Sequence, residues 1–318
     1  MYKIILLLSL FINLNANIIT LEPSYSLKAT NDVQDMLYMD KLVYTGNLDG
    51  KVNIFDLEQK KIINEIKIPN IKDFMGDDVE AKIYSIDKLN NNILISSQGQ
   101  KGYINIYLHN LEQNTTQKII DIKEKFFIRR AKFINKNKII IATLSNEIIL
   151  YDLKNKKQIY KKQISMSSFA DFSLNEDKSQ IICTDESGKI RVYNTKDFTF
   201  VKELKNINLD KIFQLSYKNG IILSAGQDRK AVIYQGNQTF SFDFDFLLYA
   251  CSLNKDASLG AIAYNVNNDV LIIDTITKKK LYSLTLNSSN ITRIIFIDNN
   301  TIIISSNDAK INIYRIKR

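Results

Sequence analysis

Few side chains in this 318-residue chain have the types and spacing from which enzymes build active sites. His109 is the single histidine, so a Ser-His-Asp triad or a multi-histidine metal site has almost nothing to be assembled from. Cys183 and Cys251 are the only cysteines, which excludes iron–sulfur clusters and cysteine-rich zinc sites. We therefore expect no catalytic residues, no cofactor and no metal site, and a function based on binding.

One segment combines acidic residues with large apolar ones, as the centres of protein interfaces do. The segment Pro69–Ala81 (PNIKDFMGDDVEA) places Phe74 and Met75 beside Asp77 and Asp78. The two apolar side chains are suited to anchoring a partner, and the carboxylates can pair with a basic patch on it. The alternative is an ordinary surface insertion whose phenylalanine packs back onto its own domain.

A second segment, Phe126-Phe-Ile-Arg-Arg130, carries two adjacent arginines. The guanidinium groups of Arg129 and Arg130 favour bidentate contacts with carboxylate or phosphate, so they are candidates for partner binding. An equally open alternative is that they pair with Asp77 or Asp78 of the same chain.

The elements that position these segments come from a pattern that repeats seven times. In Val43–Asp56, two β-forming runs flank a tight turn at Asp49-Gly50. A period of about 40–45 residues, with short strands around a tight turn, indicates the blades of a propeller. The equivalent large residues follow one another at intervals of 39 to 52 positions: Phe55, Tyr107, Tyr151, Tyr193, Tyr234, Ile273 and Tyr314.

Each repeat also has an earlier and a later β-run, such as Lys82–Asp87 and Lys61–Ile68, which gives four strands per unit. Seven such units predict an all-β fold, a seven-bladed β-propeller. The seventh unit lacks its fourth strand, and we expect Asn17–Thr30 to supply it and so close the ring. Pro23 is compatible with this role because an outermost strand has a free edge.

The units resemble WD40 repeats over essentially the whole predicted propeller. That family has an aspartate in the turn between the second and third strands, and Asp49, Asp228 and Asp308 occupy this position. Other blades have Lys101, Ser145, Ser187 and Asn267 there, and the family's tryptophan and Gly-His dipeptide are absent. We therefore expect the family's Asp-His-Ser-Trp hydrogen-bond network to be missing and blade stability to rest on apolar packing.

The first residues, 1–16 (MYKIILLLSLFINLNA), have the layout of a secretory signal peptide. Lys3 supplies the positive start, a short apolar core follows, and Ala16 is a small residue at a plausible cleavage point. The core is shorter than the roughly 20 apolar residues of a membrane span. We expect residues 17–318 to form a single propeller domain in the periplasm. The full chain has a formal net charge of +9, but an exported protein is not expected to bind nucleic acid.

A narrower resemblance concerns the accessory L proteins of periplasmic nitrate reductase gene clusters. Lys72–Asp78, Lys82–Asp87 and Ser224–Tyr234 are similar to that family, as is a signal peptide followed by a divergent propeller. The resemblance implies an accessory role in the maturation or activity of a molybdenum-containing reductase, by contact rather than catalysis. The implied partners are the periplasmic nitrate reductase or its maturation factors.

Two other functions remain open: a scaffold for outer-membrane protein assembly, and a metal-dependent propeller enzyme of the lyase or lactonase type. The enzyme requires carboxylates gathered in the channel, for which the inner strands offer Asp35, Asp87 and Asp171. For a binding function we expect one rim to carry the contacts: Phe74, Met75, Asp77, Asp78, Arg129, Arg130, Arg229 and Arg293, together with Asp210 and Lys211.

The cysteines and the histidine have expected places in this fold. Cys183 and Cys251 fall two blades apart, too far for a disulfide, so both are expected to be buried free thiols. His109 is expected at the surface, near the face opposite to the rim.

Overall fold

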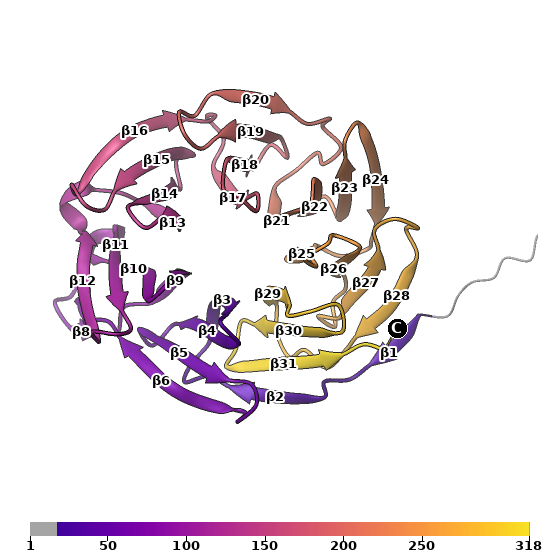
Figure 1. Ribbon diagram of the computed structural model, residues 1–318, viewed down its shortest axis with the longest axis horizontal. Helices are drawn as coiled ribbons and strands as arrows, with labels where there is room; N and C mark the ends of the chain where they lie inside the picture. The colour runs from indigo at the N-terminus through magenta and orange to yellow at the C-terminus, as the bar shows by residue number, and fades with distance from the viewer. Residues whose placement is uncertain (1–17, 318) are drawn as a thin grey trace, which may run out of the picture.

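The computed structural model describes residues 18–317 and shows seven β-sheets arranged in a ring (Figure 1). This confirms the seven-bladed β-propeller expected from the repeats, and it is consistent with a WD40-like propeller. The predicted signal peptide, residues 1–16, lies outside the described residues. None of the helices in residues 18–317 is long and apolar enough to span a membrane.

Each blade has four consecutive strands, ordered from the channel outwards, with the last strand of blade 7 supplied by the N-terminal segment. Blade 1 comprises β3 (Val33–Met39), β4 (Leu42–Asn47), β5 (Lys51–Asp56) and β6 (Lys61–Lys67). Blade 2 comprises β9 (Ile83–Leu89), β10 (Asn92–Gln98), β11 (Ile104–Asn110) and β12 (Thr115–Ile120). Blade 3 comprises β13 (Ile128–Asn135), β14 (Lys138–Thr143), β15 (Glu147–Asp152) and β16 (Lys157–Gln163). Blade 4 comprises β17 (Phe169–Leu174), β18 (Gln180–Asp185), β19 (Ile190–Asn194) and β20 (Phe200–Glu203). Blade 5 comprises β21 (Ile212–Lys218), β22 (Ile221–Gly226), β23 (Lys230–Gln235) and β24 (Gln238–Asp243).

Blades 6 and 7 also contain the two N-terminal strands, β1 (Ile19–Leu21) and β2 (Tyr25–Lys28). The other strands of blade 6 are β25 (Cys251–Leu253), β26 (Leu259–Ala263), β27 (Val270–Asp274) and β28 (Lys280–Leu284). Those of blade 7 are β29 (Ile291–Phe296), β30 (Thr301–Ser306) and β31 (Lys310–Arg315). Outside the blades lie the hairpin of β7 (Ile71–Lys72) and β8 (Asp78–Val79), and the 3₁₀ turns η1 (Gln100–Gly102) and η2 (Ile122–Glu124).

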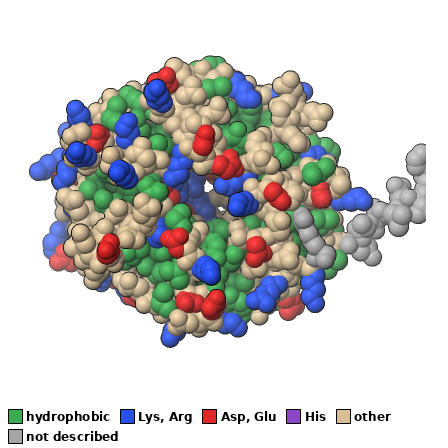
Figure 2. Space-filling view, viewed as in Figure 1, with side chains coloured by type: hydrophobic (Ala, Val, Ile, Leu, Met, Phe, Trp, Pro, Cys, Tyr) green, Lys and Arg blue, Asp and Glu red, His purple; other side chains and the backbone are tan. Residues whose placement is uncertain are grey.

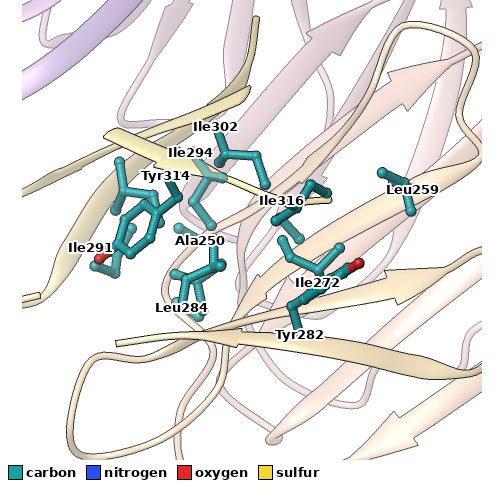
Figure 3. Packing of buried hydrophobic residues seen from close by; sticks show 14 residues of the cluster. Ala250, Leu259, Ile272, Tyr282, Leu284, Ile291, Ile294, Ile302, Tyr314 and Ile316 are labelled. Carbon is teal, nitrogen blue, oxygen red and sulfur yellow. The ribbon is translucent and has the colours of Figure 1, made fainter. Parts of the chain in front are cut away.

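The core consists of apolar layers between neighbouring blades. Side chains alternate across each strand, so a blade presents one apolar face to each neighbour. Between blades 6 and 7, Ala250, Ile272 and Leu284 meet Ile294 and Tyr314 in one cluster (Figure 3). The large residues that revealed the repeat are all buried, none more than 4% exposed. Full burial of such a side chain contributes roughly 1.5–3 kcal/mol.

The N-terminal segment closes the ring as predicted, and it also does more. β2 pairs antiparallel with β31, with Leu27 opposite Ile311, and completes blade 7. β1 in addition pairs parallel with β28, with Leu21 opposite Leu284, and becomes a fifth strand of blade 6. The sequence did not indicate this second pairing, because three residues at a sheet edge carry no periodic signal. The segment therefore links the two blades.

The expectation that blade stability rests on apolar packing alone is wrong for blade 5, which contains a buried polar network centred on Asn208. Asn208 there receives a hydrogen bond from the Ser224 hydroxyl on Oδ1, at 2.7 Å, and one from the Tyr234 hydroxyl, at 3.3 Å. Its Nδ2 donates to Asp228 Oδ1 at 3.2 Å. A carboxamide both donates and accepts, so Asn208 bridges the turn aspartate and the strand hydroxyls where the resembled family uses histidine.

Blade 7 contains a similar network. The Tyr314 hydroxyl donates to Asn287 Oδ1 at 3.1 Å, and Asn312 Nδ2 donates to the same oxygen at 3.0 Å. Asp308 is engaged separately, since the Ser306 hydroxyl and the Lys310 amide donate to it. Blade stability therefore rests on buried polar networks as well as on apolar packing.

The cysteines lie where they were expected, whereas the histidine does not. Cys183 in β18 and Cys251 in β25 are buried free thiols. The surface position expected for His109 is wrong, because this side chain is only 3% exposed. β11 continues to Asn110, which keeps His109 inside the sheet, and its Nδ1 lies 2.8 Å from the Thr116 hydroxyl. Burial lowers the pKa of the imidazole.

Candidate partner-binding face and channel mouth

The two faces of the ring differ in the connections that they carry. In blade 1, Val33 at the start of β3 lies opposite Asn47 at the end of β4, and Lys51 at the start of β5 lies opposite Lys67 at the end of β6. The inner strand therefore begins on the same side of the ring on which the outer strand ends. We call this side the upper face. It carries every loop from an outer strand to the next inner strand, and every turn between the second and third strands. The lower face carries the remaining turns.

Large apolar side chains are exposed on the upper face in loops and turns around the ring. They are between 48% and 96% exposed, and they comprise Phe74, Met75, Phe127, Leu144, Met166, Leu209, Val266 and Leu286. In the turns of the lower face, Ile276 is the comparable exposed residue among those the structure describes. The upper face is therefore the side with apolar anchors.

The hairpin β7–β8 presents Phe74 to solvent, with 95% of the residue exposed. The backbone amides of Met75 and Asp77 both donate to Asp73 Oδ1, at 2.8 and 2.9 Å, and this fixes the turn. The alternative in which the phenylalanine packs back onto its own blade is therefore wrong. The hairpin does not reach over the channel, since β8 lies near the outer margin of the ring (Figure 1).

Two of the four arginines expected on the rim, Arg130 and Arg293, lie instead in the channel. Arg293 Nε lies 2.6 Å from Asp35 Oδ1, and Arg130 forms an ion pair with Asp171. The alternative in which Arg130 pairs with Asp77 or Asp78 is wrong, because Arg130 pairs with Asp171 and Asp78 pairs with Lys72 at 2.8 Å. Figure 2 shows the hollow at the centre of the ring, with Lys and Arg side chains gathered around it.

Irregularities in the pairing of the inner strands explain this placement. Six of these strands shift register near their start, and the residue after each shift lies at the channel wall: Asp35, Ser85, Arg130, Asp171, Gln214 and Arg293. A bulge inserts one extra residue and so reverses which side chains face inwards. Simple alternation along the strands could not have indicated this ring of residues.

The three channel aspartates connect adjacent blades and do not converge on one point. Asp35 Oδ2 accepts a hydrogen bond from the Ile86 amide at 2.9 Å, on the inner strand of the next blade. In blade 2, Asp87 accepts a hydrogen bond from the Phe133 amide of blade 3 at 2.7 Å. In blade 4, Asp171 accepts a hydrogen bond from the Leu215 amide of blade 5 at 2.9 Å. Within residues 18–317, no group of three His, Cys, Asp or Glu side chains is placed to hold a metal ion.

The charge state of Asp35 follows from its surroundings. Burial alone would raise the pKa of its carboxyl group. The positive charges of Arg293, Lys132 and Arg130 outweigh this effect and lower the pKa from 3.8 to about 2. The aspartate is thus ionised at neutral pH and holds Arg293 in place. It is a structural ion pair between blades 7 and 1.

The remaining rim residues lie on the upper face. Arg229 is exposed in the turn between β22 and β23. Lys211 pairs with Glu186 at 3.2 Å, and the Asp210 side chain accepts a hydrogen bond from the Lys211 amide. Arg129 is exposed at the start of β13, and no carboxylate of the described residues lies within ion-pair distance of it.

Two adjoining cavities open at the upper end of the channel. One, of about 170 Å³, is polar and is lined by the three guanidinium groups of Arg129, Arg130 and Arg293, with Asp171 and Tyr84. The other, of about 240 Å³, is mainly apolar and is lined by Tyr84, Ile104, Phe127, Arg129 and Leu144. Tyr84 and Arg129 belong to both walls. Sequence reasoning singled out the arginines but missed Tyr84 and Leu144, which read as ordinary strand and turn residues.

A larger cavity, of about 940 Å³, lies on the lower face. Its lining includes the carboxylates of Glu176, Asp256 and Asp298, together with Lys255 and several asparagines.

Comparison of the sequence with models of protein families and with curated proteins finds no match.

Proposed function

We propose that this chain is a non-catalytic interaction protein of the bacterial periplasm, which binds another exported protein through its upper face. One observation carries the proposal: the exposed apolar side chains of the loops and turns lie almost entirely on that face. Phe74 and Met166 are each at least 95% exposed there, whereas Ile276 is the comparable residue in the lower turns of the described chain.

The chemistry of this face suits a large ligand. Protein interfaces place aromatic, methionine and arginine side chains at their centres, and the upper face offers Phe74, Met75 and Met166 with Arg129 and Arg229. The anchors are spread around a ring and not gathered in one deep pocket. This favours a protein surface over a small molecule.

We further propose that the partner belongs to the periplasmic nitrate reductase system, as the molybdenum-containing reductase or one of its maturation factors. The support is the similarity of Lys72–Asp78 and Ser224–Tyr234 to its accessory L proteins, with the signal-peptide layout of residues 1–16. The first of these stretches forms the exposed hairpin β7–β8, which carries Phe74. An accessory protein of this kind acts by contact, so its exposed hairpin is where the partner is expected.

Affinity purification from the periplasm, followed by mass spectrometry, tests the proposal. The wild type is compared with Phe74→Ala/Met75→Ala and with Ile276→Ala, the matched control on the lower face. We expect a reductase subunit or maturation factor to be recovered with the wild type and the control, and to be lost with the double variant. Equal recovery with all three, or no partner above the background of the tag, would contradict it.

The export step has its own test. Cell fractionation and N-terminal sequencing are expected to find the chain in the periplasm, beginning at Asn17. A cytoplasmic chain that retains Met1 would overturn this part of the proposal.

A further inference from the structure

We propose that the two adjoining cavities at the upper end of the channel form one bipartite site, which takes an extended segment of the partner protein bearing a side-chain carboxylate next to a large apolar residue. The inference rests on the proposed function and specifies its chemistry. It concerns the polar cavity of about 170 Å³, the apolar cavity of about 240 Å³, and the wall of Tyr84 and Arg129 that both share.

The polar cavity has one positive charge in excess. Three guanidinium groups, those of Arg129, Arg130 and Arg293, face two carboxylates, because Arg130 pairs with Asp171 and Arg293 pairs with Asp35. Arg129 is exposed, and within residues 18–317 no carboxylate lies at ion-pair distance from it. A single unbalanced guanidinium matches a monoanion such as a carboxylate better than a dianion such as a phosphate monoester.

Arg130, whose side chain lines the polar cavity, also has one unpaired donor. Arg130 Nε is buried and has no hydrogen-bond partner, although Nη1 of the same side chain bonds to Asp171 and to the Phe172 carbonyl. Buried donors in folded proteins almost always find an acceptor. The guanidinium groups of Arg130 and Arg293 are held in place by their aspartates, so these two side chains lose little entropy when an anion binds.

The apolar cavity is suited to one large side chain. Phe127 and Leu144 are 48% and 51% exposed at its rim, and Ile104 lies in its wall. The Phe127 ring packs against Tyr103 with ring centroids 4.8 Å apart, which supports it from behind. A dry cavity of about 150 Å³ is enough to hold benzene, so this one accommodates a phenylalanine or leucine side chain.

The shared wall sets the spacing of the ligand's two groups. Because Arg129 borders both cavities, the carboxylate that it binds and the side chain in the apolar cavity come from neighbouring residues. The ligand is therefore a short extended motif of Asp or Glu beside Phe or Leu.

Fluorescence anisotropy with a labelled Gly-Ser-Asp-Phe-Gly-Ser peptide and the intact propeller tests this site. We expect Asp→Asn in the peptide, or Arg129→Gln in the protein, to weaken binding about tenfold, the factor expected of one charge-assisted hydrogen bond. Combining the two changes is expected to add little. Leu144→Ala should weaken binding of this peptide but not of its Phe→Ala version.

Arg315→Gln is the matched control, since Arg315 is exposed at the end of β31 and lines neither cavity. Binding by this variant should equal that of the wild type, and wild-type binding should weaken as salt is raised. Absence of binding to the wild type, or equal affinity for the Asp and Asn peptides, would overturn the inference.

The outcomes separate this inference from the broader proposal. If Phe74-dependent capture of a partner holds but the peptide does not bind, only the bipartite site fails. If the peptide binds as expected but no partner is captured, the site stands and the proposed partner does not.

Discussion

The ion pair between Asp35 and Arg293 predicts how stability depends on pH. Asp35 is 1% exposed on the bulged start of β3, and its carboxylate bonds to Arg293 of blade 7 and to the Ile86 amide of blade 2. The substitution Asp35→Asn keeps the shape and an oxygen for the amide but removes the charge. Three blades that meet at this point lose their electrostatic link.

The magnitude follows from the pKa. Folding lowers the pKa of Asp35 from 3.8 to about 2, so the ionised form is favoured in the folded state. Each pKa unit corresponds to about 1.4 kcal/mol, which gives about 2 kcal/mol of stability at neutral pH. Because the folded pKa is the lower one, this contribution is complete well above pH 3.8 and is lost as pH falls through 2. About half should be gone near pH 3.

Urea denaturation of the wild type and of Asp35→Asn at pH 7 and pH 3 measures this difference. We expect the variant to be less stable by about 2 kcal/mol at pH 7 and by about 1 kcal/mol at pH 3. Asp245→Asn, an exposed carboxylate, is the control and should leave the free energy of unfolding nearly unchanged. A gap between wild type and Asp35→Asn that stays constant or widens on acidification would refute the reasoning.

Three further predictions concern the fold. Removal of residues 18–27, which deletes β1 and most of β2, should lower the Tm of one cooperative transition for the whole ring, and an unchanged melting curve would disprove the closure. Asn208→Leu leaves the buried Ser224 and Tyr234 hydroxyls without their acceptor and should lower the free energy of unfolding, measured by urea denaturation, by about 1–3 kcal/mol; Asn208→His should restore part of this stability. Burial raises the pKa of the Cys183 and Cys251 thiols, so both should resist maleimide until urea unfolds the chain; labelling of the native protein would contradict this.

The repeat was readable from the sequence because strand alternation and turn residues are local. The seven large residues from Phe55 to Tyr314 mark the third strand of every blade, and each is buried. The closing strand β2 could be predicted because one outer strand was missing. β1 could not, since its parallel pairing with β28 depends on where the chain passes after folding.

The candidate site was only partly predictable. The exposure of Phe74 and Met75 followed from an apolar pair inside an acidic insertion. The inward direction of Arg130 and Arg293 did not, because a bulge reverses alternation and leaves no mark in residue types. Likewise, the blades lack the histidine of WD40 repeats, yet blade 5 still has a buried hydrogen-bond network. Asn208 provides the donor to Asp228 and the acceptor for Ser224.

Site-specific photo-crosslinking in living cells tests most directly whether the upper face binds a partner. A photoreactive amino acid is placed at Phe74, Met166 or Leu209, and at Ile276 on the lower face. We expect the upper positions to crosslink to the same periplasmic protein and Ile276 to give no product with it. Crosslinks to that protein from Ile276 alone, or none from any upper position, would contradict the account.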